Sequence, residues 1–162
     1  MAKFFVTNAN GGTPQSMSTA FKTLLALFGT TSNLRRIYIE ELMASASDVP
    51  NANDCPINLD LSLMTADGTG TASAAQPSGV FETGTQLVAA TTCKANYTAE
   101  PTVTASTSRL IVGPNQRSVF RWAALSDAHR PSSPGLAAAG FVWRAKSPNY
   151  ASTMNADATF DE

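Results

Sequence analysis

The sequence predicts an all-β fold in which two antiparallel sheets pack face to face, with one helix near the N-terminus. Apolar and polar residues alternate from Ile57 to Met64, which is typical of a strand with one buried face. Two aromatic pairs at the same period, Phe120 with Trp122 and Phe141 with Trp143, are expected to fill the core. No regular alternation of strands and helices occurs, so a parallel sheet is not expected. About eight short strands with several long connections favour a jelly roll over other two-sheet folds.

Near the N-terminus the sequence predicts a strand over Lys3–Asn8 and then a helix over about residues 14–28. Pro14 suits the first helical turn and Gly29 suits the C-terminal end. The apolar residues between them recur at the spacing of one helix face: Met17, Ala20, Phe21, Leu24, Leu25 and Phe28. Lys22 is the only charge in this segment, whereas a membrane-surface helix carries several basic residues. We therefore expect the helix to pack against a sheet.

After Gly29 the apolar period changes from the helical spacing to two. Residues 36–42 alternate as a strand does, and they precede a loop rich in Ser, Asp, Asn and Pro over Ser45–Pro56. The segment Thr65–Ser78 combines a turn with a Thr/Ala strand that is too poor in large side chains to anchor a core. We expect that strand at the edge of a sheet.

The C-terminal half contains further strand candidates separated by turns. Arg109–Val112 and Ser118–Ala124 flank the turn residues Gly113–Gln116, so we expect a hairpin. Ser126–Gly135 should be an exposed loop, and Met154–Phe160 alternates as a closing strand. No linker or internal repeat divides the chain, so residues 1–162 are expected to form a single domain.

Composition argues against several classes of partner. Charged residues make up 14% of the chain against a usual fraction of about 25%, and the net charge is -1. The largest basic cluster is the pair Arg35–Arg36, so nucleic acid is not an expected partner. The longest apolar runs fall far short of the ~18 residues of a membrane span, so no membrane partner is expected. The apolar run Phe4–Val6 is too short for a signal-peptide core, and synthesis in a cytoplasm is expected.

Reactive side chains are few and scattered. The only histidine is His129, and no Gly-x-Ser-x-Gly segment presents a serine nucleophile. Cys55 and Cys93 lie far apart and outside any Cys-x-x-Cys pair, so neither a zinc site nor a redox motif is expected. Without an export signal we expect two reduced, buried thiols rather than a disulfide. The adjacent Glu40 and Glu41 would point to opposite faces of a strand, so they do not form a catalytic acid pair. We expect no catalytic residue, no metal site and no cofactor.

Several ordered segments resemble a group of short structural proteins encoded by tailed bacteriophages, and the resemblance spans Phe4 to Phe160. The segments that carry it are Ala20–Leu27, Leu34–Arg36, Asn115–Arg117, Arg121–Ala124, and Arg144–Pro148 with Tyr150. Some members of this group are similar to cement or decoration proteins, which are jelly rolls that trimerise on the outside of the capsid shell.

The resemblance implies a non-enzymatic virion protein on the outer capsid surface, made in the host bacterial cytoplasm. It implies the major capsid protein as a partner and a homo-oligomer, a trimer, as the assembly. For contacts with the shell or with neighbours we expect the segment Lys3–Asn10 and the two loops Ser45–Pro56 and Ser126–Gly135. The candidate contact residues are Lys3, Phe4, Phe5, Asn8, Asn51, Asn53, His129 and Arg130.

Three other interpretations remain open. A carbohydrate- or receptor-binding module of a phage tail or fibre would show exposed tyrosines around one loop end, with Tyr38, Tyr97 and Tyr150 as the available platforms. A hydrolase would have to use acids and a base drawn from Asp60, Asp127 and His129. Arginines at 35, 36, 117, 121 and 144 are equally suited to structural ion pairs with Glu40, Glu41, Asp60 or Asp157.

Overall fold

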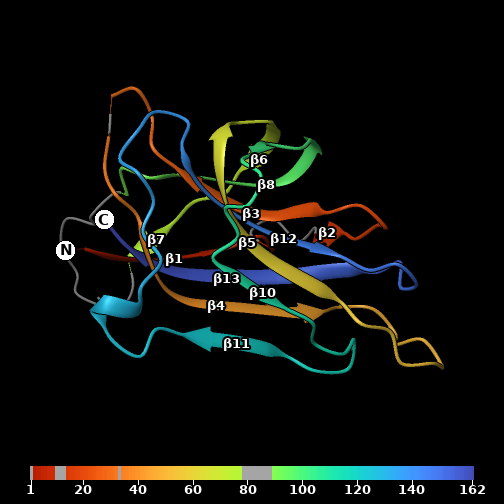
Figure 1. Cartoon of the computed structure of the whole chain (residues 1–162). Helices are drawn as coiled ribbons and strands as arrows, with labels where there is room; N and C mark the ends of the chain where they lie inside the picture. The colour runs from red at the N-terminus through yellow and green to blue at the C-terminus, as the bar shows by residue number, and fades with distance from the viewer. Residues whose placement is uncertain (1, 10–13, 33, 78–88) are drawn as a thin grey trace.

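Two antiparallel β-sheets packed face to face form the fold (Figure 1). The structure is a computed structural model that describes residues 2–9, 14–32, 34–77 and 89–162. Sheet A contains, in spatial order, β11 (Phe120–Ala123), β4 (Tyr38–Ala46), β13 (Thr153–Asp161), β1 (Lys3–Thr7) and β7 (Gln76–Pro77), and β2 (Gln15–Ser16) also pairs with β13. Sheet B contains β10 (Leu110–Val112), β5 (Asn58–Ala66), β12 (Gly140–Lys146), β3 (Lys22–Phe28), β8 (Thr92–Ala99) and β6 (Thr69–Ala72), and β9 (Thr102–Val103) also pairs with β5.

Eight of these strands have the order of a jelly roll. In sheet A the order is β1, β13, β4 and β11, and in sheet B it is β3, β12, β5 and β10. The chain crosses between the sheets from β1 to β3, from β3 to β4, from β4 to β5, and again at each step from β10 to β13. This order is that of two interleaved Greek keys, so the predicted jelly roll is confirmed. The strands β8 and β6 extend sheet B beyond β3, which confirms the expected edge position of the Thr/Ala segment.

The helix expected over residues 14–28 is wrong, because this segment contains the strands β2 and β3. Every residue of Thr23–Phe28 is buried, at 5% exposure or less. Leu25 and Leu27 face the interior of the sandwich, while Ala26 and Phe28 join a second apolar cluster on the outer side of sheet B. A strand buried on both faces reads as one continuous apolar run. Such a run also satisfies the spacing of a helix face, and periodicity alone does not separate the two.

The core between the sheets is built mainly from aromatic and aliphatic side chains at period two. Phe141 and Trp143 of β12 are fully buried, as predicted. Phe120 and Trp122 of β11 are half-buried and pack against the core cluster, and the rings of Phe120 and Trp143 lie 5.9 Å apart. A further ring pair, Phe4 with Phe160, joins the neighbouring strands β1 and β13.

The expected hairpin between Arg109–Val112 and Ser118–Ala124 is also wrong. Residues Leu110–Val112 pair with β5 in sheet B, and Phe120–Ala123 pair with β4 in sheet A. The turn between them therefore carries the chain across the sandwich. The period-two pattern predicts that each of the two segments is a strand with one buried face. It does not predict which of the two sheets each strand joins.

Candidate functional site

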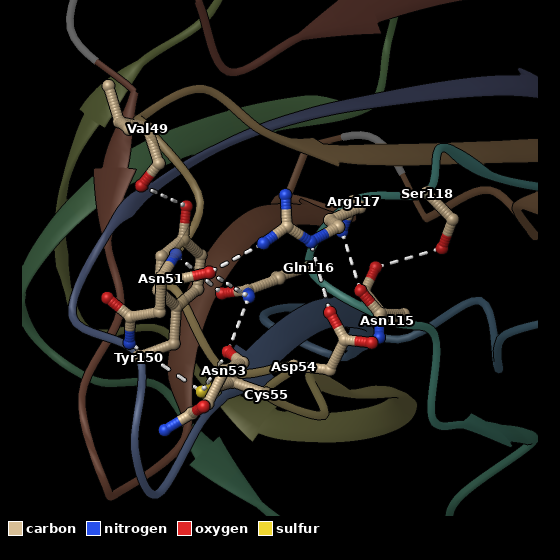
Figure 2. Close-up of polar contacts among 10 residues, drawn as sticks. All are labelled: Val49, Asn51, Asn53, Asp54, Cys55, Asn115, Gln116, Arg117, Ser118 and Tyr150. Atoms are coloured by element: carbon tan, nitrogen blue, oxygen red, sulfur yellow. Dashed lines mark hydrogen bonds and ion pairs between the residues drawn. The ribbon is translucent and has the colours of Figure 1, made fainter.

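Three connections meet at one end of the sandwich. They join β4 to β5 (residues 47–57), β10 to β11 (residues 113–119) and β12 to β13 (residues 147–152). Figure 2 shows the polar contacts among them. Because a jelly roll moves between its sheets at every one of these steps, it gathers loops that are distant in the sequence. The first connection contains Asn51 and Asn53, two of the contact residues predicted from the sequence.

Gln116 binds the backbone of the connection between β4 and β5 from its buried side. Its side chain is 4% exposed. The side-chain nitrogen Nε2 donates to the carbonyl oxygens of Asn51 (3.2 Å) and Asn53 (2.9 Å), and Oε1 accepts from the backbone N–H of Asn51 (3.3 Å). One amide therefore satisfies three backbone groups of a loop that is 63 to 65 residues away in sequence.

Arg117 holds the same loop from its exposed side. The guanidinium donates through Nε to the carboxylate of Asp54 at 3.0 Å and through Nη2 to the carbonyl oxygen of Asn51 at 2.7 Å. The backbone N–H of Arg117 donates to the side chain of Asn115, which fixes the turn that presents the arginine. Figure 2 shows Gln116 and Arg117 reaching the loop side by side.

The connection between β12 and β13 supplies further anchors. Tyr150 is 3% exposed and its hydroxyl donates to the carbonyl oxygens of Asp48 and Val49. The Asp48 carboxylate accepts the backbone N–H of Thr153 at 2.8 Å and the hydroxyl of Ser152 at 2.9 Å. These hydrogen bonds hold the pKa of Asp48 below its ordinary value of 3.8.

The result is a fully exposed loop that is fixed along its length. Every residue from 47 to 54 is exposed. Asn51 adds a hydrogen bond from its own side chain to the carbonyl oxygen of Asn149 at 3.0 Å. Val49, with 87% of its surface accessible, is the most exposed large apolar residue of a surface that also carries side-chain amides and the carboxylates of Asp48 and Asp54. A surface held in this way loses little conformational freedom when it binds. We call residues 47–54 with Asn149 the anchored loop.

The other predicted contact residues lie elsewhere in the fold. Phe4 and Asn8 are buried at 1% exposure, and the Asn8 side chain donates to the carbonyl oxygen of Met154 and accepts the N–H of Ala156. The exposed surface of β1 comes instead from Lys3 and Phe5. Asn10 lies outside the described residues.

Lys3 and Arg130 lie together in a pocket of about 280 Å³ on sheet A, next to η1 (Asp127–His129). The Arg130 guanidinium is 6% exposed and contacts Asp161 at 2.5 Å, Glu40 at 3.0 Å and Asp127 at 3.2 Å. Lys3 contacts Glu40 at 2.7 Å. Partial burial alone would raise the pKa of Glu40, but Lys3 and Arg130 hold it below its ordinary value. Three carboxylates surround the two cations, and every one of these charges has a partner of opposite sign, so the pocket is lined by an ion-pair network.

The side chains considered for hydrolysis have structural partners. The alternation of residues 57–64 puts Asp60 on the polar face of its strand, where a solvated carboxylate is expected, but Asp60 is 2% exposed and contacts Arg144 at 2.5 Å. Asp127 pairs with Arg130. His129 is exposed, and its Nδ1 lies 2.8 Å from the hydroxyl of Ser126. No group of three or more His, Cys, Asp or Glu side chains suited to a metal ion occurs in the part of the chain that the structure describes.

All three tyrosines of the chain are at least half-buried. Tyr97 and Tyr150 are 4% and 3% exposed, and the guanidinium of Arg130 lies 5.4 Å from the ring of Tyr38. Trp143 is fully buried. An open aromatic platform at a loop end, which is the feature expected of a sugar-binding module, is therefore not formed by the tyrosines.

The two cysteines are both free and buried, as the sequence indicated. Burial raises the pKa of the Cys93 thiol to about 12. None of the helical residues described forms a helix long and apolar enough to cross a membrane.

The composition of residues 45–56 predicts a surface loop, which the structure confirms, but it does not indicate which side chains hold that loop. The sequence indicates Gln116 only as part of a turn and Asp48 only as part of a loop. It indicates Arg117 as a candidate for an ion pair, but with Glu40, Glu41, Asp60 or Asp157 and not with Asp54. No local signal identifies their partners, because each pairs with a segment at least 63 residues away.

Comparisons with protein-family models, with curated proteins and with solved structures found no match.

Proposed function

We propose that this chain is a non-enzymatic contact protein that decorates and stabilises the outer surface of a tailed-phage capsid, bound as a homotrimer to the major capsid protein. The anchored loop is the observation that carries the proposal. It is exposed along its whole length, it is fixed by groups from two other connections, and it presents Val49 and side-chain amides beside two carboxylates, Asp48 and Asp54, that already have partners within the protein.

A shell protein needs this kind of surface. Each copy makes a modest contact, and repetition around a symmetric shell multiplies the effect. A loop that is already ordered avoids the cost of about 0.5–1.5 kcal/mol for each side chain that binding would otherwise immobilise. The jelly-roll scaffold keeps the loop in place, and the segments that resemble phage structural proteins span the same chain.

A carbohydrate- or receptor-binding module of a tail or fibre is the second candidate. The same anchored loop supports a receptor contact, but the burial of Tyr97 and Tyr150 disfavours stacking on a sugar ring. The two candidates differ in where the protein lies on the particle.

Cryo-electron microscopy of purified virions that carry this chain decides between them. We expect trimers on the outside of the shell, with the anchored loop against the major capsid protein. Density confined to the tail or to fibre tips would favour the second candidate. Absence of the chain from purified particles would contradict both.

A binding assay tests the loop itself. Shells that lack the chain are incubated with purified protein, and the bound fraction is measured after sedimentation. Val49→Glu should weaken binding about tenfold or more, because it places an unpaired charge at the apolar point of the contact. Thr71→Glu, at an exposed position on the edge strand β6, is the matched control and should bind like the unaltered protein.

A further inference from the structure

The strand β11 forms an open edge of sheet A. In the part of the chain that the structure describes, β4 is the only strand that pairs with it, and Figure 1 shows it as the outermost strand beyond β4. Phe120 pairs with Ala44 and Trp122 with Leu42, and the N–H of Ala124 donates to the carbonyl oxygen of Glu40 at 2.8 Å. The last contact shows that the even-numbered residues use their backbone groups toward β4.

The odd-numbered residues therefore direct their N–H and C=O groups outward. In an antiparallel pair, alternate residues bond to opposite sides of the strand. Arg121 and Ala123 are the two such residues within β11, and Val119 and Leu125 flank them. All four side chains are exposed, with Val119 at 66% and Leu125 at 92%.

This edge lacks the features that usually prevent strand pairing. Natural edge strands are commonly guarded by lysine, by proline or by a bulge. Residues 118–126 contain neither lysine nor proline, and the pairing of β11 with β4 is regular. The only charge is Arg121, which pairs with Glu41 on the same sheet. The backbone groups at this edge are therefore open to pairing with another strand.

We propose that β11 pairs antiparallel with β11 of a second copy of this chain, with Arg121 of each copy opposite Ala123 of the other. Arg121 of each copy and Ala123 of the other then exchange backbone N–H···O=C hydrogen bonds, and the twofold axis passes between the two Trp122 residues. This register places Val119 beside Leu125 of the second copy at both ends, so the two exposed apolar residues cover each other. The register centred on Arg121 would oppose two like charges, which is unfavourable.

Charge complementarity supports the same register. On β4, Glu41 lies directly opposite Ala123. Arg121 of the second copy would lie on the other side of Ala123, in line with Glu41. Alanine is too small to separate them, so the arginine can extend over it and share Glu41 with the Arg121 that already pairs there. Each carboxylate would then interact with an arginine from both copies.

This contact goes beyond the proposed capsid role and does not depend on it. It is a twofold contact between copies, whereas the trimer is a threefold one. The two can therefore fail separately: loss of shell binding leaves the β11 contact intact, and loss of the β11 contact leaves the anchored loop intact.

The association is tested by analytical ultracentrifugation of the full chain over a wide concentration range. We expect a monomer–dimer equilibrium, or a doubling of any larger assembly. Ala123→Lys should raise the dissociation constant about tenfold or more, because it faces Arg121 of the second copy. Ala123→Glu, at the same position with the opposite charge, should retain association, and Thr71→Lys, at an exposed position on β6 of the other sheet, is the charge control. A chain that stays monomeric, or an oligomer unchanged by Ala123→Lys, overturns the proposal.

Cross-linking tests the register. Paired residues of this kind have Cα atoms about 5.5 Å apart, within the range of a disulfide. A mixture of Arg121→Cys protein and Ala123→Cys protein should form a covalent dimer on mild oxidation, and either protein alone should not. The native cysteines are both buried, so they should not contribute. Equal cross-linking in the single-variant samples, or none in the mixture, overturns this register.

Discussion

Gln116 pairs with the backbone of Asn51 in both directions, accepting from its N–H and donating to its carbonyl oxygen. The side chain thereby imitates one step of a β-ladder between two loops. This relationship makes Gln116 the principal internal support of the anchored loop.

Gln116→Ala should lower the free energy of unfolding by about 2 kcal/mol, because partly buried backbone groups of Asn51 and Asn53 lose their partners. Urea unfolding measures the loss, and hydrogen exchange should show faster exchange at the Asn51 amide. Asn149→Ala truncates an exposed amide of the same region and should change stability by less than about 0.5 kcal/mol. Equal losses in the two variants would contradict the role of Gln116.

Acid should loosen the anchored loop through Asp48. Its pKa is lowered by hydrogen bonds from Thr153 and Ser152, so the stabilisation is complete above its ordinary value of 3.8. The stabilisation is lost as the pH falls from 3.8 through the lower folded pKa. Stability measured between pH 6 and pH 2 should show this loss in the unaltered protein, and Asp48→Asn should remove that part of the pH dependence. Asp54→Asn, on the same exposed loop, should leave it in place.

A glycine substitution tests whether residues 22–28 form a strand. A Cβ atom at Gly140 would lie 1.9 Å from the carbonyl oxygen of Leu27, because β12 and β3 run side by side there. Gly140→Ala should therefore destabilise the protein by about 3 kcal/mol. Gly113→Ala meets only an ordinary contact with Asn58 and is the matched control. Thermal unfolding of the two variants gives the comparison, and similar midpoints would contradict the pairing.

Removing only the cation of the ion pair between Asp60 and Arg144 should cost more stability than removing both charges. Asp60 is 2% exposed and also accepts the hydroxyl of Ser62. Arg144→Met should cost about 3 kcal/mol, because the carboxylate remains buried without its cation, and adding Asp60→Asn should recover most of the loss. A double-mutant cycle in guanidinium chloride measures this coupling. Arg121→Met, which breaks an exposed pair with Glu41, should cost less than about 1 kcal/mol.

The sequence predicted the fold class because burial on one face of a strand leaves a local pattern. Leu59 and Leu61 alternate with smaller or polar residues, and both are fully buried in β5. Leu24–Phe28 misled the prediction because both faces of β3 are covered, so that no alternation remains.

Partners distant in sequence could not be predicted. The alternation with Leu59 and Leu61 places Asp60 on the polar face of its strand and predicts a solvated carboxylate. Arg144 lies on the adjacent strand and covers it, which no local pattern indicates. Gln116 and Asn51 are likewise brought together only by the crossing of the chain between sheets. Turn composition identified both segments as loops but contained no information about which loops meet.

The pairing of β1 with β13 has a consequence for how the molecule forms. Lys3 lies opposite Asp161, and Phe4 opposite Phe160, so the first strand pairs with the last. Among the described strands, β1 otherwise pairs only with the two-residue β7, so most of its pairing in sheet A cannot form until residues 153–161 have left the ribosome. The chain must lose the loop-closure entropy before the contacts between distant strands can form and stabilise it. Folding should therefore be slow, on the order of milliseconds to seconds. Until then the open edges of the nascent strands remain exposed, and this interval is when the protein is most vulnerable to aggregation.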